Sequence, residues 1–345
     1  MRSPDAGSWR LLFGKERREL ASSRAWLVSL VVLGPLVGHA FITAVESHAD
    51  MTGSAGGPAP LAHDVSPLAV VVPTFQAYVV VASLLYPFVA IRLVSSEKQS
   101  GALKLLLQAP SSLGTMLAIK LLVLVLGWVL AWLPGLAALA LWRSYGGQLA
   151  APETAAVLSE HLLRATLICA IAIAVAALID NPATAAVITL TMTLGSLALD
   201  FIARLRGGVA LAIDLYTPEF ALRTLERGEV RLSLVVITLI LTLGALLLAW
   251  VWLSPSRTRR QRIVFTLPMA VGVALLLFGA AQLHQSWDLT GLAGIPPAGE
   301  RASAYSGYPL PTEARSAAVI FYLLWPLVVL ALWWRSRRPR ITQTS

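Results

Sequence analysis

Charged side chains are scarce in this chain. Only 13% of its 345 residues are Asp, Glu, Lys or Arg, whereas 57% are hydrophobic and the mean hydropathy is +0.73. A typical soluble domain carries about 25% charged residues. The composition therefore argues against a water-soluble fold of this length, and the excess apolar surface is expected to face lipid.

Cysteine is nearly absent as well. Cys169 is the only one and lies in an apolar run, so neither a disulfide framework nor a cysteine metal site can be built. The sequence also lacks the Gly-x-x-x-x-Gly-Lys-Ser/Thr phosphate loop, the His-Glu-x-x-His zinc motif and the Gly-x-Ser-x-Gly nucleophile motif. We expect no catalytic residue, no metal site and no cofactor bound by the chain itself.

The formal charge of +9 could indicate a nucleic-acid-binding protein. The arginines, however, flank apolar runs and do not gather on one face, which is the pattern of a membrane protein. We therefore expect a lipid bilayer, and no nucleic acid, as the surrounding partner.

Long apolar runs recur along the chain. About 20 apolar residues in a helix cross the roughly 30 Å of hydrocarbon in a bilayer. Eight segments have about this length, with Pro73 and Pro87 inside the second and Pro134 inside the third: 26–45, 68–94, 116–142, 161–179, 183–202, 232–253, 263–283 and 317–334. The sequence predicts an all-α, polytopic integral membrane protein.

The distribution of basic residues predicts the orientation of these spans. If the N-terminus is cytoplasmic, most of the 27 lysines and arginines fall on the cytoplasmic side and most of the 18 acidic residues fall outside. This segregation follows the positive-inside rule. Both termini, including the basic C-terminal segment, are therefore expected in the cytoplasm.

The segments outside the spans suggest three parts. Residues 1–25 contain Trp9, Leu12 and Phe13 beside several arginines, which predicts a short amphipathic helix on the cytoplasmic surface. Residues 26–253 hold six spans, and residues 254–345 hold two more. Residues 204–231 are moderately apolar but interrupted, so we expect short re-entrant or interfacial helices there, and no clear element in 285–315.

The most informative segment follows the second span. Residues 101–108 predict a short amphipathic helix, because Leu103, Leu106 and Leu107 fall on one face. Pro110 is expected to stop this helix, and Ser111 or Ser112 can cap the next one. Such a helix needs an apolar surface to cover its leucine face, either the bilayer or a groove on a partner protein.

This segment resembles that of the ABC-2 type permeases. After their second span they commonly carry an acidic residue, Gly-Thr-Leu-Glu-Leu-Leu, Pro with a hydroxyl residue, and a Lys at the start of the third span. The corresponding residues here are Glu97, Gly101, Ala102, Leu103, Lys104, Leu105, Leu106, Pro110, Ser111 and Lys120. Ala102 and Lys104 depart from the pattern, since a hydroxyl and an acidic residue are usual there.

A weaker likeness precedes the sixth span, at Tyr216, Thr217, Pro218, Phe220 and 226–230, and Lys15 with Glu16 fits the family's opening. The resemblance covers about residues 8–253. The two further spans are similar to those of longer members of the gliding-motility-like branch.

The resemblance implies a function. In that family the helix after the second span is the coupling helix that docks on the ATPase. This implies an ATPase-coupling role for Glu97, Gly101, Leu103, Leu106 and Pro110. It also implies a separate cytoplasmic ABC ATPase that binds ATP with Mg²⁺, a second permease copy or paralogue, alternating access, export, and a bacterial inner membrane.

Three rival functions remain open. A proton-coupled secondary transporter could use His39, which lies about two thirds along the first span. Paired acids deep in the spans are not apparent, because His161, Arg164, Asp180 and Asp200 fall near predicted span ends. An intramembrane enzyme would have only His63 and Asp64 in a flexible outer loop. A non-transporting membrane anchor for a cytoplasmic ATPase would carry the same coupling helix.

Overall fold

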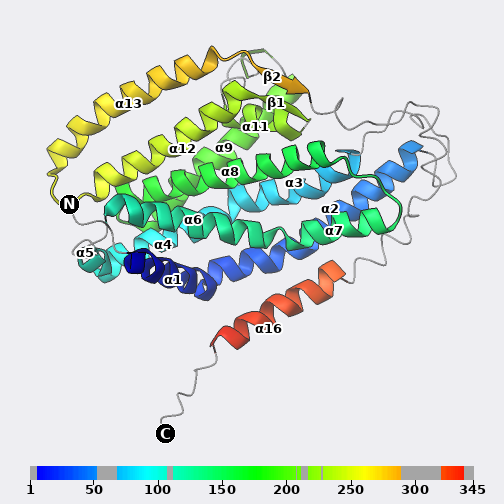
Figure 1. The fold of residues 1–345 in the computed structure, drawn as a ribbon, viewed down its shortest axis with the longest axis horizontal. Helices are drawn as coiled ribbons and strands as arrows, with labels where there is room; N and C mark the ends of the chain where they lie inside the picture. The colour runs from blue at the N-terminus through cyan, green and yellow to red at the C-terminus, as the bar shows by residue number, and fades with distance from the viewer. Residues whose placement is uncertain are drawn as a thin grey trace, which may run out of the picture.

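The computed structural model describes residues 6–52, 68–106, 112–206, 208–210, 217–226, 228–288 and 320–337. Within these ranges the chain is almost entirely helical (Figure 1). The helices are α1 (Ala6–Ser22), α2 (Arg24–Thr52), α3 (Leu68–Leu84), α4 (Tyr86–Ser100), α5 (Ala102–Leu106), α6 (Leu113–Ala131), α7 (Leu133–Ser144), α8 (Ala151–Leu178), α9 (Pro182–Arg206), α11 (Pro218–Glu226), α12 (Leu232–Leu253), α13 (Arg259–Ala281), the π-helix η1 (Ile320–Leu324) and α16 (Trp325–Arg337).

In the described part of the chain, seven helical segments are long and apolar enough to cross a membrane: Arg24–Thr52, Leu68–Ser100, Leu113–Ser144, Ala151–Leu178, Pro182–Ala203, Leu232–Leu253 and Arg259–Ala281. They coincide with the first seven predicted spans, so the prediction of an all-α polytopic membrane protein is confirmed. The predicted eighth span corresponds to a shorter apolar helix, Ile320–Arg335, and residues 317–319 lie outside the described ranges. The eighth span and the three-part division therefore stay predictions.

Two of the spans are interrupted next to a proline. The second breaks between α3 and α4, just before Pro87, and the third breaks between α6 and α7, just before Pro134. Proline has no backbone N–H and its ring collides with the preceding turn, so the helical hydrogen bonds stop there. Pro73 lies within α3 without breaking it.

A tyrosine hydroxyl satisfies backbone groups freed at the second break. The hydroxyl of Tyr78 donates to the carbonyl of Ala131 at 3.1 Å and accepts from the N–H of Gly135 at 2.9 Å. A side chain at Gly135 would collide with the rings of Phe75 and Tyr78. Such repair by a neighbouring helix is what makes a broken helix tolerable in hydrocarbon.

Helix α8 lies at the centre of the bundle. It packs against α3, α4, α6, α11 and α12, and two thirds of its most apolar stretch is buried. The residues that face these neighbours are mostly small, including Ala165, Cys169, Ala172 and Ala176. Small side chains let helix backbones approach closely where lipid offers no hydrophobic driving force.

The last two described helices lie at the periphery. Helix α13 runs along the outside of α12, with little of its surface buried, and α16 lies against α2 (Figure 1). Gly34 and Gly38, one turn apart on α2, make room for the rings of Trp325 and Phe321, and Trp325 Nε1 donates to the carbonyl of Leu30 at 2.7 Å.

Two sequence predictions were wrong. The fourth span does not begin at residue 161, because α8 already starts at Ala151, and the polar first turns of this helix are buried against its neighbours. Residues 286–288 were expected to form no element, yet they form β2 (Ser286–Asp288), which pairs antiparallel with β1 (Glu229–Arg231). Three-residue strands carry too little periodicity to be recognised in a sequence.

The bundle has two ends that matter below. The α5 end contains α5, the start of α6 and the turn from α8 to α9. The α11 end contains α11, the strands β1 and β2, and the start of α8 (Figure 1).

Candidate functional site at the α5 end

The segment expected to couple to an ATPase lies at the α5 end. Helix α4 ends at Gly101, whose φ of 74° is left-handed and suits glycine, and α5 then runs in a new direction. The predicted helix therefore begins at Ala102 and not at Gly101. Residues 107–111, and with them Pro110, lie outside the described ranges. Ser112 caps α6 by accepting from the N–H of Thr115 at 3.1 Å, as predicted.

Two of the leucines predicted on the apolar face of this segment, Leu103 and Leu106, are not fully exposed to solvent. Leu103 is half-buried and packs against the hydrophobic core of the bundle, and Leu106 is half-buried as well. The exposed side chains near α5 are instead polar, with Gln99 and Ser100 at the end of α4. A partner docking here would contact the edge of α5 together with the last turn of α4.

Glu97 is buried and belongs to a cluster of four charges. Its carboxylate lies 2.9 Å from the ammonium group of Lys120, which also contacts both carboxylate oxygens of Glu16 at 2.9 Å. Lys120 further donates to the carbonyl of Leu93 at 3.0 Å. With only 3% of Glu97 exposed, its carboxylate is not available to a docking partner. Glu97 instead fixes the end of α4 to α1 and α6 through its buried ion pairs with Lys15 and Lys120.

Lys15 completes this group, which we call the α5-end cluster (Lys15, Glu16, Glu97 and Lys120). Its ammonium contacts Glu97 directly and lies 3.1 Å from Glu16. Burial opposes the charged form of Lys15, but its contacts with Glu97 and Glu16 raise its pKa above the ordinary value. Burial also raises the pKa of Glu16, although Lys120 and Lys15 act in the opposite direction.

The α5-end cluster contains two positive and two negative groups from α1, α4 and α6. Each buried ion has an oppositely charged partner, which compensates the desolvation cost, and the partly exposed Glu19 lies 3.4 Å from Lys15 at the edge of the cluster. The cluster therefore fastens the amphipathic helix α1 to the helices on both sides of α5. Helix α1 was predicted to lie on the membrane surface, but Glu16 and Leu20 show that one of its faces is buried in the bundle.

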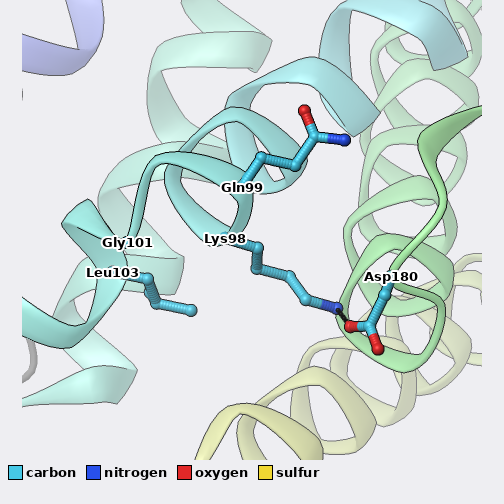
Figure 2. A pocket seen from close by; sticks show the side chains of 5 residues that line it. All are labelled: Lys98, Gln99, Gly101, Leu103 and Asp180. Atoms are coloured by element: carbon cyan, nitrogen blue, oxygen red, sulfur yellow. Dashed lines mark ion pairs between the residues drawn. The ribbon is translucent and has the colours of Figure 1, made fainter.

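A shallow cleft of about 300 Å³ lies beside α5, lined by Lys98, Gln99, Gly101, Leu103 and Asp180 (Figure 2). Lys98 reaches across it from α4 to the turn between α8 and α9, where its ammonium lies 2.8 Å from Asp180. The hydrogen bond and the charge of Lys98 hold the pKa of Asp180 below its usual range.

Lys98 also donates hydrogen bonds to backbone carbonyls at the C-terminal end of α8. It donates to the carbonyls of Ala176, Ala177 and Ile179 at 3.0 to 3.2 Å. The last carbonyls of a helix have no partner within it and carry its negative dipole end, so a lysine is favourable there. Lys98 thus ties the segment leading into α5 to the central helix of the bundle.

Comparison with known proteins gives no further identification. No protein-family model matches the chain, and no curated protein matches it either. The geometry of the site and the sequence resemblance therefore carry the functional argument.

His39, the intramembrane candidate, lies on the exposed face of α2 and not between helices. The sequence predicts that His161, Arg164 and Asp200 lie near span ends, where their polar groups can reach water. This prediction is wrong, because all three side chains are buried. All three are at most 3% exposed, with Arg164 paired to Glu160 and Glu219 and Asp200 paired to Arg223. Ten residues of α8 precede His161, which places it well inside the helix.

The structure also adds residues that the sequence did not single out as a site. In the sequence, Lys15 and Glu16 belong to the amphipathic opening and Glu226 to the weaker family likeness, while Glu160 carries no signal of its own. The sequence does indicate that Glu16 has a basic partner, because it is an acid among basic residues on one predicted helix, and Lys15 next to it is one such partner. Its other partner, Lys120, is 104 residues away and could not be chosen by spacing.

Proposed function

We propose that the chain is the membrane-spanning permease subunit of an ATP-driven ABC exporter. A separate cytoplasmic ATPase would bind ATP with Mg²⁺ and dock at the α5 end. Two permease copies, or one copy and a paralogue, would enclose the substrate path in a bacterial inner membrane. In this proposal the chain itself carries no catalytic residue.

One observation supports this proposal above the others. The segment that resembles the coupling helix lies at one end of the bundle, beside an open cleft, and is joined to the spans by buried charges. The α5-end cluster connects it to α1 and α6, and Lys98 connects it to α8. A displacement of α5 would be transmitted through these buried contacts to α4, α6 and α8, which belong to three different spans.

Transport would follow from two arrangements of these spans. ATP-driven closure of the ATPase pair would displace α5, and the helices fastened to it would reorient toward the opposite face. Such coupling requires that the ATPase bind the two arrangements with different affinity. The breaks before Pro87 and Pro134 offer positions where the second and third spans can bend.

The docking site is tested by co-purification from native membranes. The tagged chain would be solubilised in detergent and its partners identified by mass spectrometry. Gln99→Trp places a bulky ring on the exposed side of the cleft while leaving the buried cluster intact. We expect an ATP-binding subunit to co-purify with the unaltered chain and to be reduced at least ten-fold with this variant.

Ser144→Trp is the matched control. It adds the same ring at an exposed position at the end of α7, which is the end of the third span that lies away from α5. It should retain the ATPase. If the well-folded chain recovers no ATP-binding subunit, the proposal is overturned. If the subunit is recovered but neither variant reduces it, docking at the α5 end is overturned. ATPase stimulation by transport substrate separates an exporter from a mere anchor.

A second function is favoured by a specific observation. Buried carboxylates were the missing feature of a proton-coupled transporter, and Glu160 and Glu226 are now both buried beside α8. Proteoliposomes containing the chain alone would distinguish the two functions. A pH gradient would drive solute movement without ATPase in the second case and would have no effect in the first.

A further inference from the structure

A second group of buried charges lies at the α11 end. It comprises Glu160, His161 and Arg164 on α8, with Glu219 and Glu226 on α11, and we call it the α11-end cluster. The side chains of Glu160, His161 and Arg164 are 0 to 3% exposed, and those of Glu219 and Glu226 are largely buried.

The charges in this cluster do not balance. Arg164 lies 2.5 Å from Glu160 and contacts Glu219 directly, so a single guanidinium serves two carboxylates. Among the described residues, the amide of Gln76 donates to both carboxylate oxygens of Glu226 at 3.1 Å. Arg223, the other nearby cation, is paired with Asp200. Within the cluster three carboxyl groups face one guanidinium, so their full ionisation would leave two negative charges without a cation of the cluster to offset them.

Two atoms in the cluster face each other without a hydrogen bond. His161 Nδ1 and Glu160 Oε2 lie 3.1 Å apart and are both buried, and neither forms a hydrogen bond to any described residue. Buried polar groups are nearly always hydrogen-bonded, so such a pair indicates a missing partner. The rings of Phe75 and Tyr78 pack against the imidazole, which holds its orientation.

The same residues have the arrangement of a metal site. Glu160, His161 and Glu226 each offer a ligand atom, and these atoms lie within 4.8 Å of one another. Tetrahedral Zn²⁺ binds nitrogen and carboxylate oxygen at about 2.0–2.2 Å, which places the ligand atoms roughly 3.4 Å apart. Small rotations of the carboxylates would therefore close the site around an ion.

We propose that Glu160, His161 and Glu226 bind a divalent transition-metal ion of the Zn²⁺ type, which fastens α11 to α8. The ion would supply the two positive charges that the described residues lack. Imidazole favours Zn²⁺ and its neighbours over the hard cations Ca²⁺ and Mg²⁺, which prefer oxygen ligands alone. Glu219 stays with Arg164 and leaves Glu226 to the ion.

The site is distinct from the α5-end cluster, where every carboxylate faces a lysine. A second group of three acids, Glu16, Glu19 and Glu97, also lies close together, but each of them already pairs with Lys15 or Lys120, and none of the described residues in this group is a histidine. We expect no metal ion there. This group supplies the matched control for the experiment.

The test uses the full-length chain in detergent, purified through a tag that contains no histidine. After treatment with a chelator, the chain would be incubated with Zn²⁺ and desalted, and its retained metal measured by mass spectrometry. We expect about one ion per chain, raising the midpoint of thermal unfolding. His161→Gln and Glu226→Gln should each weaken Zn²⁺ binding at least ten-fold, whereas Glu19→Gln should leave it unchanged.

Co²⁺ provides a readout that does not depend on the variants folding. In the unaltered chain it should give the intense visible absorption of a tetrahedral site, displaced by Zn²⁺ and not by Ca²⁺ or Mg²⁺. The proposal is overturned if the unaltered chain retains no Zn²⁺ and gives no such spectrum. It is also overturned if folded His161→Gln and Glu226→Gln chains bind as tightly as the original.

Discussion

The two buried clusters solve the same problem in opposite ways. At the α5 end, Lys15 and Lys120 face Glu16 and Glu97, and four side chains satisfy one another. At the α11 end, Arg164 pairs with both Glu160 and Glu219, and Glu226 accepts hydrogen bonds from the amide of Gln76. Burying an ion costs several kcal/mol unless it is paired. A complete cluster can therefore act as a rigid joint, whereas an incomplete one invites a further ligand.

The comparison also separates two kinds of function. The α5-end cluster lies behind the proposed docking segment and needs no partner of its own to be stable. The α11-end cluster joins a short helix, α11, to the central helix α8, and its stability depends on what neutralises it. Four substitutions, taken from the largest expected effect to the smallest, would break or sharpen this difference.

Lys120→Met should be the most damaging change. It leaves Glu16 and Glu97 buried beside each other with only the half-exposed Lys15 as a counter-charge. Removing one partner of a buried pair costs about 3–5 kcal/mol. Thermal unfolding followed by size-exclusion analysis should detect early aggregation. Adding Glu97→Gln to the same chain should recover part of the loss, and a failure to do so would argue against charge balance as the cause.

Lys98→Met should cost less, about 1.5–3 kcal/mol, which is the range for hydrogen bonds made by a charged group. Three carbonyls at the end of α8 would lose their donor, but the turn there can reach water. Hydrogen exchange should increase at residues 176–180 and not at the start of α8. Uniformly faster exchange along α8 would contradict this local role.

Glu226→Gln should stabilise the metal-free protein, whereas the two lysine substitutions should destabilise it. Removing one of the surplus carboxylates lowers the repulsion within the α11-end cluster, and we expect a gain of about 1 kcal/mol, as for a single buried polar interaction. Glu97→Gln in the balanced cluster should destabilise. Unfolding midpoints of the two variants in the presence of chelator test the contrast, which fails if both shift in the same direction.

Asp180→Asn should have the smallest effect, below about 1 kcal/mol, because the carboxylate is almost fully exposed and water screens its pairing with Lys98. Lys98 lowers the pKa of Asp180, so the pairing stabilises the fold above the unfolded pKa and is lost as the pH falls through the folded value. The difference between variant and original should vanish at strongly acidic pH and shrink in high salt.

The sequence predicted the helices better than it predicted the sites. Apolar runs predicted the seven described helical segments that are long and apolar enough to span, because lipid requires every backbone group to be satisfied within a helix and leaves few alternatives. Residues 151–160 were missed as part of α8, because Glu153 and Glu160 make that stretch too polar for a span that faces lipid. Their burial against α3 and α11 makes the same stretch compatible with the interior of the bundle.

The sequence correctly placed a short helix after the second span, and its coupling role stays a prediction, but the parts of this segment take different structural roles. Gly101 ends α4, Leu103 packs inward, and Glu97 is buried with Lys120, which the sequence pattern had already placed beside the segment. Spacing can identify that an acid and a lysine recur together. It does not reveal that they form one ion pair, because the 22 residues between them include a reversal of the chain between α4 and α6.

By itself, the sequence determined that this chain is a helical, multi-pass membrane protein and that a short helix follows its second span. Hydrophobicity and local spacing act over one or two helical turns, so both can be read without a fold. Only the tertiary structure decided which charges meet. Glu16 with Lys120, and Glu226 with Glu160 and His161, come from helices far apart in the chain, and the packing of those helices alone makes one cluster complete and leaves the other short of a cation.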